Sequence, residues 1–152
     1  MTDHALFDQV GEIIRGAAPP ALGHPRVQVR HNGVKAWFGD PEPQREHYEA
    51  QLIPAELAPA ARTHAVEIGF HAEHRDEPAN QAVLDRLRTA EPRWRTELGD
   101  DPVPGPFLGR TTWRRISETW PDLDLDAPDL PFEIGVRLVD YIRALEPLRR
   151  GV

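Results

Sequence analysis

An Asn-Gly pair inside an alternating run of apolar residues is the strongest constraint on the fold of this chain. The run covers residues 27–38, and Asn32 and Gly33 are the residues that a two-residue type I′ hairpin turn requires. With that turn, His31 pairs with Val34 and the apolar side chains share one face. These side chains are Val27, Val29, Val34, Ala36 and Phe38. The pattern predicts a β-hairpin with one buried face.

Two more segments, residues 46–53 and 63–71, alternate in the same way and predict strands. Each has an apolar face and a polar face. The polar positions are His47, Glu49 and Gln51 in the first strand, and Glu67 and His71 in the second. A fifth strand is predicted over residues 110–117, after a loop at 100–106.

Helical spacing of apolar residues predicts a first helix over residues 4–15 and a last helix over about 131–146. A middle helix runs from Asp76, a suitable N-cap, to Gly99, and Pro92 should kink or split it. The order is α-β-β-β-β-α-β-α. We therefore expect a single α+β domain over residues 1–152, with a mostly antiparallel sheet of about five strands and helices on one face.

Composition excludes several classes of function. The chain has 152 residues with a formal net charge of −7, which disfavours binding to nucleic acid or to an anionic membrane. It has no cysteine, and this excludes disulfides, thiolate metal sites, iron–sulfur clusters and cysteine nucleophiles. The start lacks a secretory signal pattern and no segment is apolar enough to span a bilayer, so we expect a bacterial protein of the cytoplasm without membrane contact.

The pattern of residues 65–117 resembles an uncharacterised bacterial family. A strand beginning Val66-Glu67 is followed by a helix opened by Asn80, a Leu98-Gly99 stop and a strand containing Trp113-Arg114-Arg115. The family is one of the domain-of-unknown-function families, some members of which accompany restriction-endonuclease-like domains. The resemblance implies the fold order given above and carries no catalytic residues.

The polar face of the sheet is the main candidate site. Its ligand-binding candidates are His47, Glu49, Glu67, His71 and Arg115. These residues form either a solvated or buried structural network, in which Arg115 or Arg30 neutralises Glu67, or a pocket for a small molecule or metal. Glu67 and His71 are about 13 Å apart along a strand, so we do not expect both to bind one ion unless a bulge intervenes or residues of other strands contribute.

Three other clusters are predicted to be structural. The residues 71–74, which include two histidines, are expected in a surface turn. The acidic run 122–133 has part of the spacing of an EF-hand but carries Ala127 where that loop needs glycine, so we expect an acidic loop before the last helix. Arg110, Arg114 and Arg115 flank Trp113 and could contact nucleic acid, but acidic sequence flanks this short run.

The sequence also lacks the P-loop, the dinucleotide-binding glycine pattern and the GxSxG elbow. A restriction-type nuclease needs a lysine two residues after a carboxylate, but Gly33 and Val34 precede Lys35, the only lysine. We therefore expect a non-catalytic accessory or protein-interaction protein with an unidentified protein partner, no catalytic residue, no metal and no cofactor. The alternatives are an enzyme that binds a ligand or metal on the polar sheet face, and a nuclease-associated module that contacts nucleic acid without cleaving it.

Overall fold

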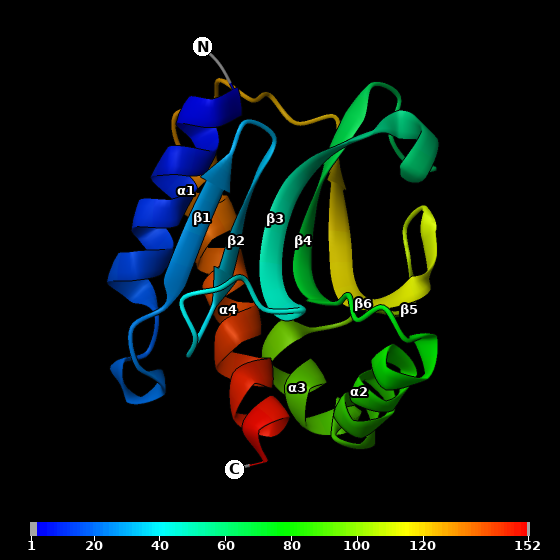
Figure 1. Ribbon diagram of the computed structural model, residues 1–152. Helices are drawn as coiled ribbons and strands as arrows, with labels where there is room; N and C mark the ends of the chain where they lie inside the picture. Colours follow the sequence, from blue (N-terminus) through cyan, green and yellow to red (C-terminus); the bar gives the residue numbers. More distant parts are fainter. Residues whose placement is uncertain (1–2, 152) are drawn as a thin grey trace.

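A six-stranded antiparallel sheet forms the centre of the structure, a computed structural model that describes residues 3–151. Its strands lie in the order β1-β2-β3-β4-β6-β5 (Figure 1). Their bounds are β1 Arg26–Arg30, β2 Gly33–Trp37, β3 Glu46–Pro54, β4 His64–Ala72, β5 Val103–Phe107 and β6 Arg110–Pro121. The long central strands β3 and β4 are strongly curved, as Figure 1 shows.

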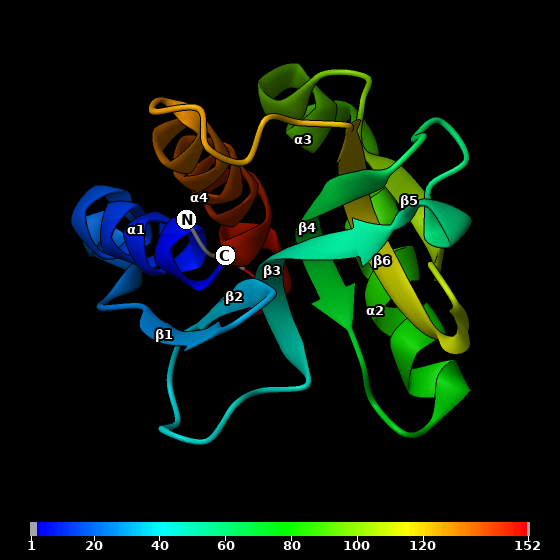
Figure 2. The same cartoon turned by 90° about the horizontal axis from the view of Figure 1, so that it is seen from above.

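Four α-helices complete the described part of the fold, and with the sheet they make it α+β, as predicted. They are α1 Asp3–Ala17, α2 Glu77–Thr89, α3 Glu91–Leu98 and α4 Leu130–Arg150. Figures 1 and 2 show α1 and α4 on one face of the sheet and α2 and α3 near one end of it. Apolar side chains of the helices and of this sheet face form one core, in which Tyr48, Phe70 and Trp94 are fully buried. No described helix has the length and apolar run required to cross a membrane.

The sheet has six strands rather than the five predicted, because residues 103–107 form β5 where a loop was expected. Pro104 and Pro106 disfavour a strand in the middle of a sheet. At the edge of a sheet, however, a strand bonds on one side only, so the missing N–H groups of proline are tolerated there. The middle helix is split into α2 and α3 at Ala90, in keeping with the prediction that Pro92 would interrupt it.

The hairpin of β1 and β2 forms, but its predicted register is wrong by two residues, because Val29 was expected to pair with Ala36. Val29 pairs with Val34 and Arg30 with Gly33, so the connecting residues are His31 and Asn32. Gly33 does not have a positive φ and belongs to β2. The reason is β3: a Cβ on Gly33 would lie 2.9 Å from the carbonyl oxygen of Ala50, so glycine serves the close approach of two strands instead of a type I′ turn.

Candidate metal centre

The face of the sheet opposite α1 and α4 carries the predicted polar residues on strands β3 and β4. His47 pairs directly with His71, Glu49 with Gly69, and Gln51 with Glu67. Alternation along each strand sends these side chains to one face. The side chains of four of these residues are almost completely buried, namely those of His47, Glu49, Glu67 and His71. The sequence therefore placed the polar face correctly.

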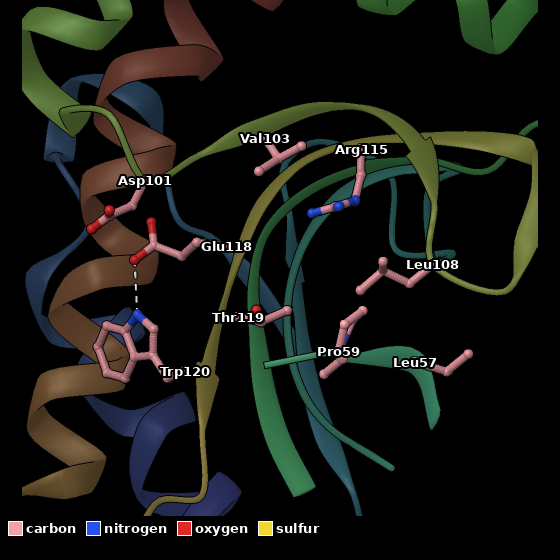
Figure 3. A pocket seen from close by; sticks show the side chains of 10 residues that line it. Leu57, Pro59, Asp101, Val103, Leu108, Arg115, Glu118, Thr119 and Trp120 are labelled. Carbon is pink, nitrogen blue, oxygen red and sulfur yellow. Dashed lines mark hydrogen bonds between the residues drawn. The ribbon is translucent and has the colours of Figure 1, made fainter. Parts of the chain in front are cut away.

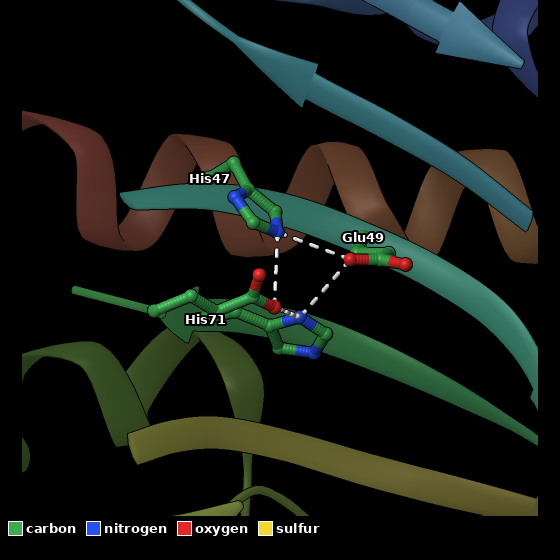
Figure 4. A group of neighbouring side chains, drawn as sticks. His47, Glu49 and His71 are labelled. Carbon is green, nitrogen blue, oxygen red and sulfur yellow. Dashed lines mark hydrogen bonds and ion pairs between the residues drawn. The ribbon is translucent and has the colours of Figure 1, made fainter. Parts of the chain in front are cut away.

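Four side chains of this face converge on one point. Figure 4 labels three of them, His47, Glu49 and His71. His47 Nε2 lies 3.0 Å from Glu49 Oε1 and 3.4 Å from Glu73 Oε2. His71 Nδ1 lies 3.2 Å from the same oxygen of Glu49 and 3.1 Å from the same oxygen of Glu73. Two nitrogen and two oxygen atoms thus alternate around a ring, and all four lie within 4.8 Å of one another. Among residues 3–151 this is the one group of three or more metal-ligating side chains so arranged.

The outer nitrogen of each histidine is held by an acceptor. His47 Nδ1 donates to the carbonyl oxygen of Gln44 at 2.8 Å. His71 Nε2 donates to Glu67 Oε2 at 2.7 Å, and Glu67 in turn accepts from Gln51 Nε2 at 3.0 Å. Because a carbonyl only accepts, the Nδ1 of His47 carries a proton, and both rings are fixed with their other nitrogen toward the ring of four atoms.

The contact between His71 and Glu67 corrects the expectation that their spacing along a strand keeps them apart. No bulge brings them together, because β4 pairs with β3 and β6 without interruption through these residues. Gly69 lies between them on the same face and has no side chain, so the long side chains of Glu67 and His71 meet above it. A Cβ there would collide with the carbonyl oxygen of Ile116 and with Ser117 on β6.

Glu73 was missed by sequence reasoning, which assigned residues 71–74 to a surface turn. His71 is instead fully buried, and the pairing of β3 with β4 extends past Ala72, since the N–H of Glu73 donates to the carbonyl oxygen of Arg45 at 2.8 Å. This backbone bond fixes Glu73 beside the two histidines, with its side chain 12% exposed. His74 lies outside the cluster and bonds to Glu46 at 2.7 Å.

The electrostatics of the four residues favour charged forms. Burial by itself would raise the pKa of Glu73, but hydrogen bonds from His47 and His71 outweigh it and lower that pKa to about 2. The same balance places the pKa of Glu49 far below its ordinary range. Burial opposes protonation of His71, but the charge of Glu67 and bonds to three carboxylates raise its pKa well above 6.5. Without an ion, positive imidazole rings therefore balance the carboxylates.

A pocket of about 240 Å³ opens beside the cluster and is lined by Glu49 and Glu73, but by neither histidine. Phe107, at the end of β5, packs edge-on against His71 with 4.6 Å between ring centroids, and against Trp113 at 5.5 Å. The unexpected strand β5 thus helps to cover the histidine side of the cluster, while the carboxylate side faces the pocket.

Arg115 is not part of the cluster. It was expected to neutralise Glu67, but its guanidinium donates to Ser117 and to the carbonyl oxygen of Pro106, and the ion pair of Glu67 is with His71. Figure 3 shows Arg115 in a different pocket, of about 310 Å³, between the η2 turn Ala55–Leu57 and β6. Arg30 also takes another partner, Glu49 Oε2, at 3.0 Å.

The remaining candidates do not assemble into sites. Arg110 stacks on Trp113, whereas Arg114 bonds to Gln81 and to the backbone, and Arg115 points to the other pocket. These arginines therefore do not share one surface. In the acidic run, Asp122 and Asp124 bond to backbone N–H groups instead of converging on one point.

Comparison with known proteins adds no relative. No family model matches the chain, and no curated protein or solved structure matches it significantly. The resemblance of residues 65–117 to a bacterial family stays a prediction, and the functional argument rests on the site itself.

Proposed function

We propose that this chain is a metal-dependent enzyme whose divalent ion is held by His47, Glu49, His71 and Glu73. The ring of alternating nitrogen and oxygen atoms, with 3.0–3.4 Å between neighbours, carries the proposal. An ion bonded at about 2.0–2.2 Å in tetrahedral or octahedral geometry separates neighbouring ligand atoms by about 2.8–3.6 Å. Neighbouring atoms of the ring are thus spaced as adjacent ligands of one ion.

The surroundings of the histidines support the same conclusion. Histidines that bind a metal almost always donate their other ring N–H to a carboxylate or a carbonyl, and His47 and His71 donate to one of each. Burying ionised groups on a sheet face costs stability, and ion pairing alone is a weak reason for it. Binding of an ion would explain why these ionised groups are buried in spite of their cost in stability.

The ligand set indicates the kind of ion. Two imidazoles with two carboxylates suit a first-row divalent ion such as Zn²⁺, Fe²⁺ or Mn²⁺, whereas Ca²⁺ and Mg²⁺ prefer oxygen ligands throughout. Catalytic centres leave one position open, and here Glu49 and Glu73 line a pocket. A divalent ion in such a place polarises a bound oxygen atom or activates water.

This function is the metal-binding alternative identified from the sequence. The non-catalytic accessory role, the unidentified protein partner, the absence of a metal and the cytoplasmic location stay predictions, as does the nucleic-acid-contacting module. Among the described residues, Val103 and Phe132 are the large hydrophobic side chains left exposed, on β5 and α4.

Calorimetric titration of tag-free, chelator-treated protein with Zn²⁺ tests the proposal. We expect one ion per chain. Glu73→Gln removes a ligand at the least buried position, so the variant should fold and lose more than the about 10–100-fold in affinity that outer partners of a metal site contribute. His47→Gln should do the same. His31→Gln, in the exposed β1–β2 turn, is the matched control and should bind as the wild type does.

Two results would show the proposal to be wrong. One is folded wild-type protein that binds none of Zn²⁺, Fe²⁺ and Mn²⁺ at one ion per chain. The other is a folded Glu73→Gln variant with the zinc affinity of the wild type. Circular dichroism of each variant establishes that it is folded.

A further inference from the structure

We propose that the pocket beside the metal centre binds a phosphate group as a dianion, and that Lys35 and Arg110 are the residues that recognise it. The inference rests on the proposed metal function, because the ion supplies part of the positive charge. It assigns a chemical class to the ligand of that centre.

Three basic residues line the pocket together with the carboxylates of Glu49 and Glu73. Arg30 ends β1, Lys35 lies in β2 directly opposite Glu49 of β3, and Arg110 begins β6. The fold therefore gathers these charges from separate strands. They do not form a charged run along one segment of the chain.

Two of these charges are not neutralised by protein. The guanidinium of Arg30 pairs with Glu49 Oε2 at 3.0 Å. Within residues 3–151, by contrast, Lys35 and Arg110 make no ion pair with a carboxylate; Arg110 lies over the ring of Trp113, 4.4 Å from its centroid. In a chain with 25 acidic residues against 18 basic ones, two such cations in one cavity indicate an anionic ligand.

The charge balance points to a dianion. A divalent ion and Arg30 together carry three positive charges, which offset the carboxylates of Glu49, Glu67 and Glu73, so that Lys35 and Arg110 remain uncompensated. A phosphate group carries about −1.5 to −2 charges at pH 7 and offers three acceptor oxygens, which match the guanidinium fork of Arg110 and the ammonium group of Lys35. A simple carboxylate carries a single charge and leaves one cation unmatched.

Calorimetric titration of the stoichiometrically zinc-loaded protein with inorganic phosphate, in a phosphate-free buffer, tests the inference. Lys35→Gln and Arg110→Gln should each weaken phosphate binding by about 10-fold, the loss of one charge-assisted contact. Both should keep the wild-type affinity for Zn²⁺, since neither residue is a ligand. Arg62→Gln, an exposed arginine away from the pocket, is the control for net charge and should bind phosphate as the wild type does. Acetate should bind more weakly than phosphate.

The outcomes separate this inference from the proposed function. If zinc binds but phosphate does not, or if phosphate binds equally to wild type, Lys35→Gln and Arg110→Gln, the inference is wrong and the metal centre stands. Acetate binding as tight as that of phosphate also contradicts it. If zinc itself does not bind at one ion per chain, the proposed function fails, and the inference fails with it.

Discussion

The imidazole of His71 and the carboxylate of Glu67 are in direct contact inside the protein, with 2.7 Å between Nε2 and Oε2. Both side chains are fully buried, and Gln51 holds the carboxylate from the neighbouring strand. This bond fixes the plane of the ring and turns Nδ1 toward Glu49 and Glu73. Glu67 is therefore a positioning residue for the proposed centre, one step removed from the ion.

Glu67→Gln tests that role. The amide oxygen of glutamine still accepts from Nε2, so the ring keeps its orientation, but the charge that supports it is lost. We expect zinc affinity to fall by about 10-fold or more. The free energy of unfolding of the metal-free protein should fall by about 1–3 kcal/mol, from the loss of a buried charged hydrogen bond. Calorimetry and urea unfolding measure the two effects.

Glu42→Gln, in the exposed loop before β3, is the control and should change neither quantity. A purely structural role for Glu67 would lower stability alone. Zinc affinity equal to that of the wild type in the folded Glu67→Gln variant would thus contradict positioning.

Alternation along two strands was enough to predict most of the candidate site. It placed His47, Glu49, Glu67 and His71 on one face, because side-chain direction in a strand depends only on the parity of the position. It could not predict which of them touch. That depends on the position without a side chain at Gly69, where the close approach of β6 leaves no room for a Cβ.

The parts that the sequence did not predict depend on contacts between distant segments. Glu73 joins the cluster because of a backbone bond to Arg45, 28 residues earlier. Phe107 covers His71 because a proline-containing segment pairs with β6 as an edge strand. Gly33 entered β2 because β3 packs against it. In each case local propensity was outweighed by tertiary pairing.

Gly69→Ala should be among the most damaging single substitutions in the sheet. Its Cβ would meet the carbonyl oxygen of Ile116 and the Ser117 backbone, so β4 and β6 would have to separate beneath the proposed metal centre. We expect a loss of about 3 kcal/mol or more in the free energy of unfolding, at or above the usual cost of overpacking. Gly105→Ala, where the added Cβ meets nothing within 4 Å, is the matched control. Equal unfolding midpoints for the two variants would contradict this account.

Asp122 holds the segment before β4 against the end of β6. Its carboxylate accepts from the N–H groups of Arg62 and Thr63 and from the Thr63 hydroxyl, at 2.8–2.9 Å. The bonds from Thr63 and Arg62 keep the pKa of Asp122 well below its ordinary range. Asp122→Ala removes both acceptor oxygens, and with them the bonds from all three donors, and leaves a non-glycine residue at φ 55°, so amide hydrogen exchange at Arg62 and Thr63 should become faster.

Asp122→Asn keeps one acceptor oxygen and tolerates the left-handed conformation. Its exchange rates at the same two amides should lie between those of the wild type and Asp122→Ala. Unchanged rates in Asp122→Ala would mean that the carboxylate does not hold this segment.

Glu146 should make stability depend on pH in the acid range. It is buried in α4, accepts from the hydroxyl of Tyr48 at 2.9 Å, and pairs with Arg149 and Arg150, while Arg149 also reaches Glu46. Burial by itself would raise the pKa of Glu146, but the bonds from the two arginines outweigh it and lower that pKa below the ordinary value of 4.5. The folded protein thus binds this proton less readily than the unfolded chain. The resulting stability is complete above about pH 4.5 and is lost as pH falls through the folded pKa.

Glu146→Gln removes both the ion pairs and the titration. At pH 7 we expect the variant to be less stable than the wild type by about 1–3 kcal/mol, because Tyr48 keeps an acceptor and the arginines are partly exposed to solvent. The difference should shrink as the pH is lowered below 4.5, since the wild type then loses the same charge. Urea unfolding at pH 7 and at pH 3.5 measures it, with the exposed Glu97→Gln in α3 as the control. A difference that stays constant between the two pH values would contradict this account, because the loss of stability in the variant would then not come from the titrating charge of Glu146.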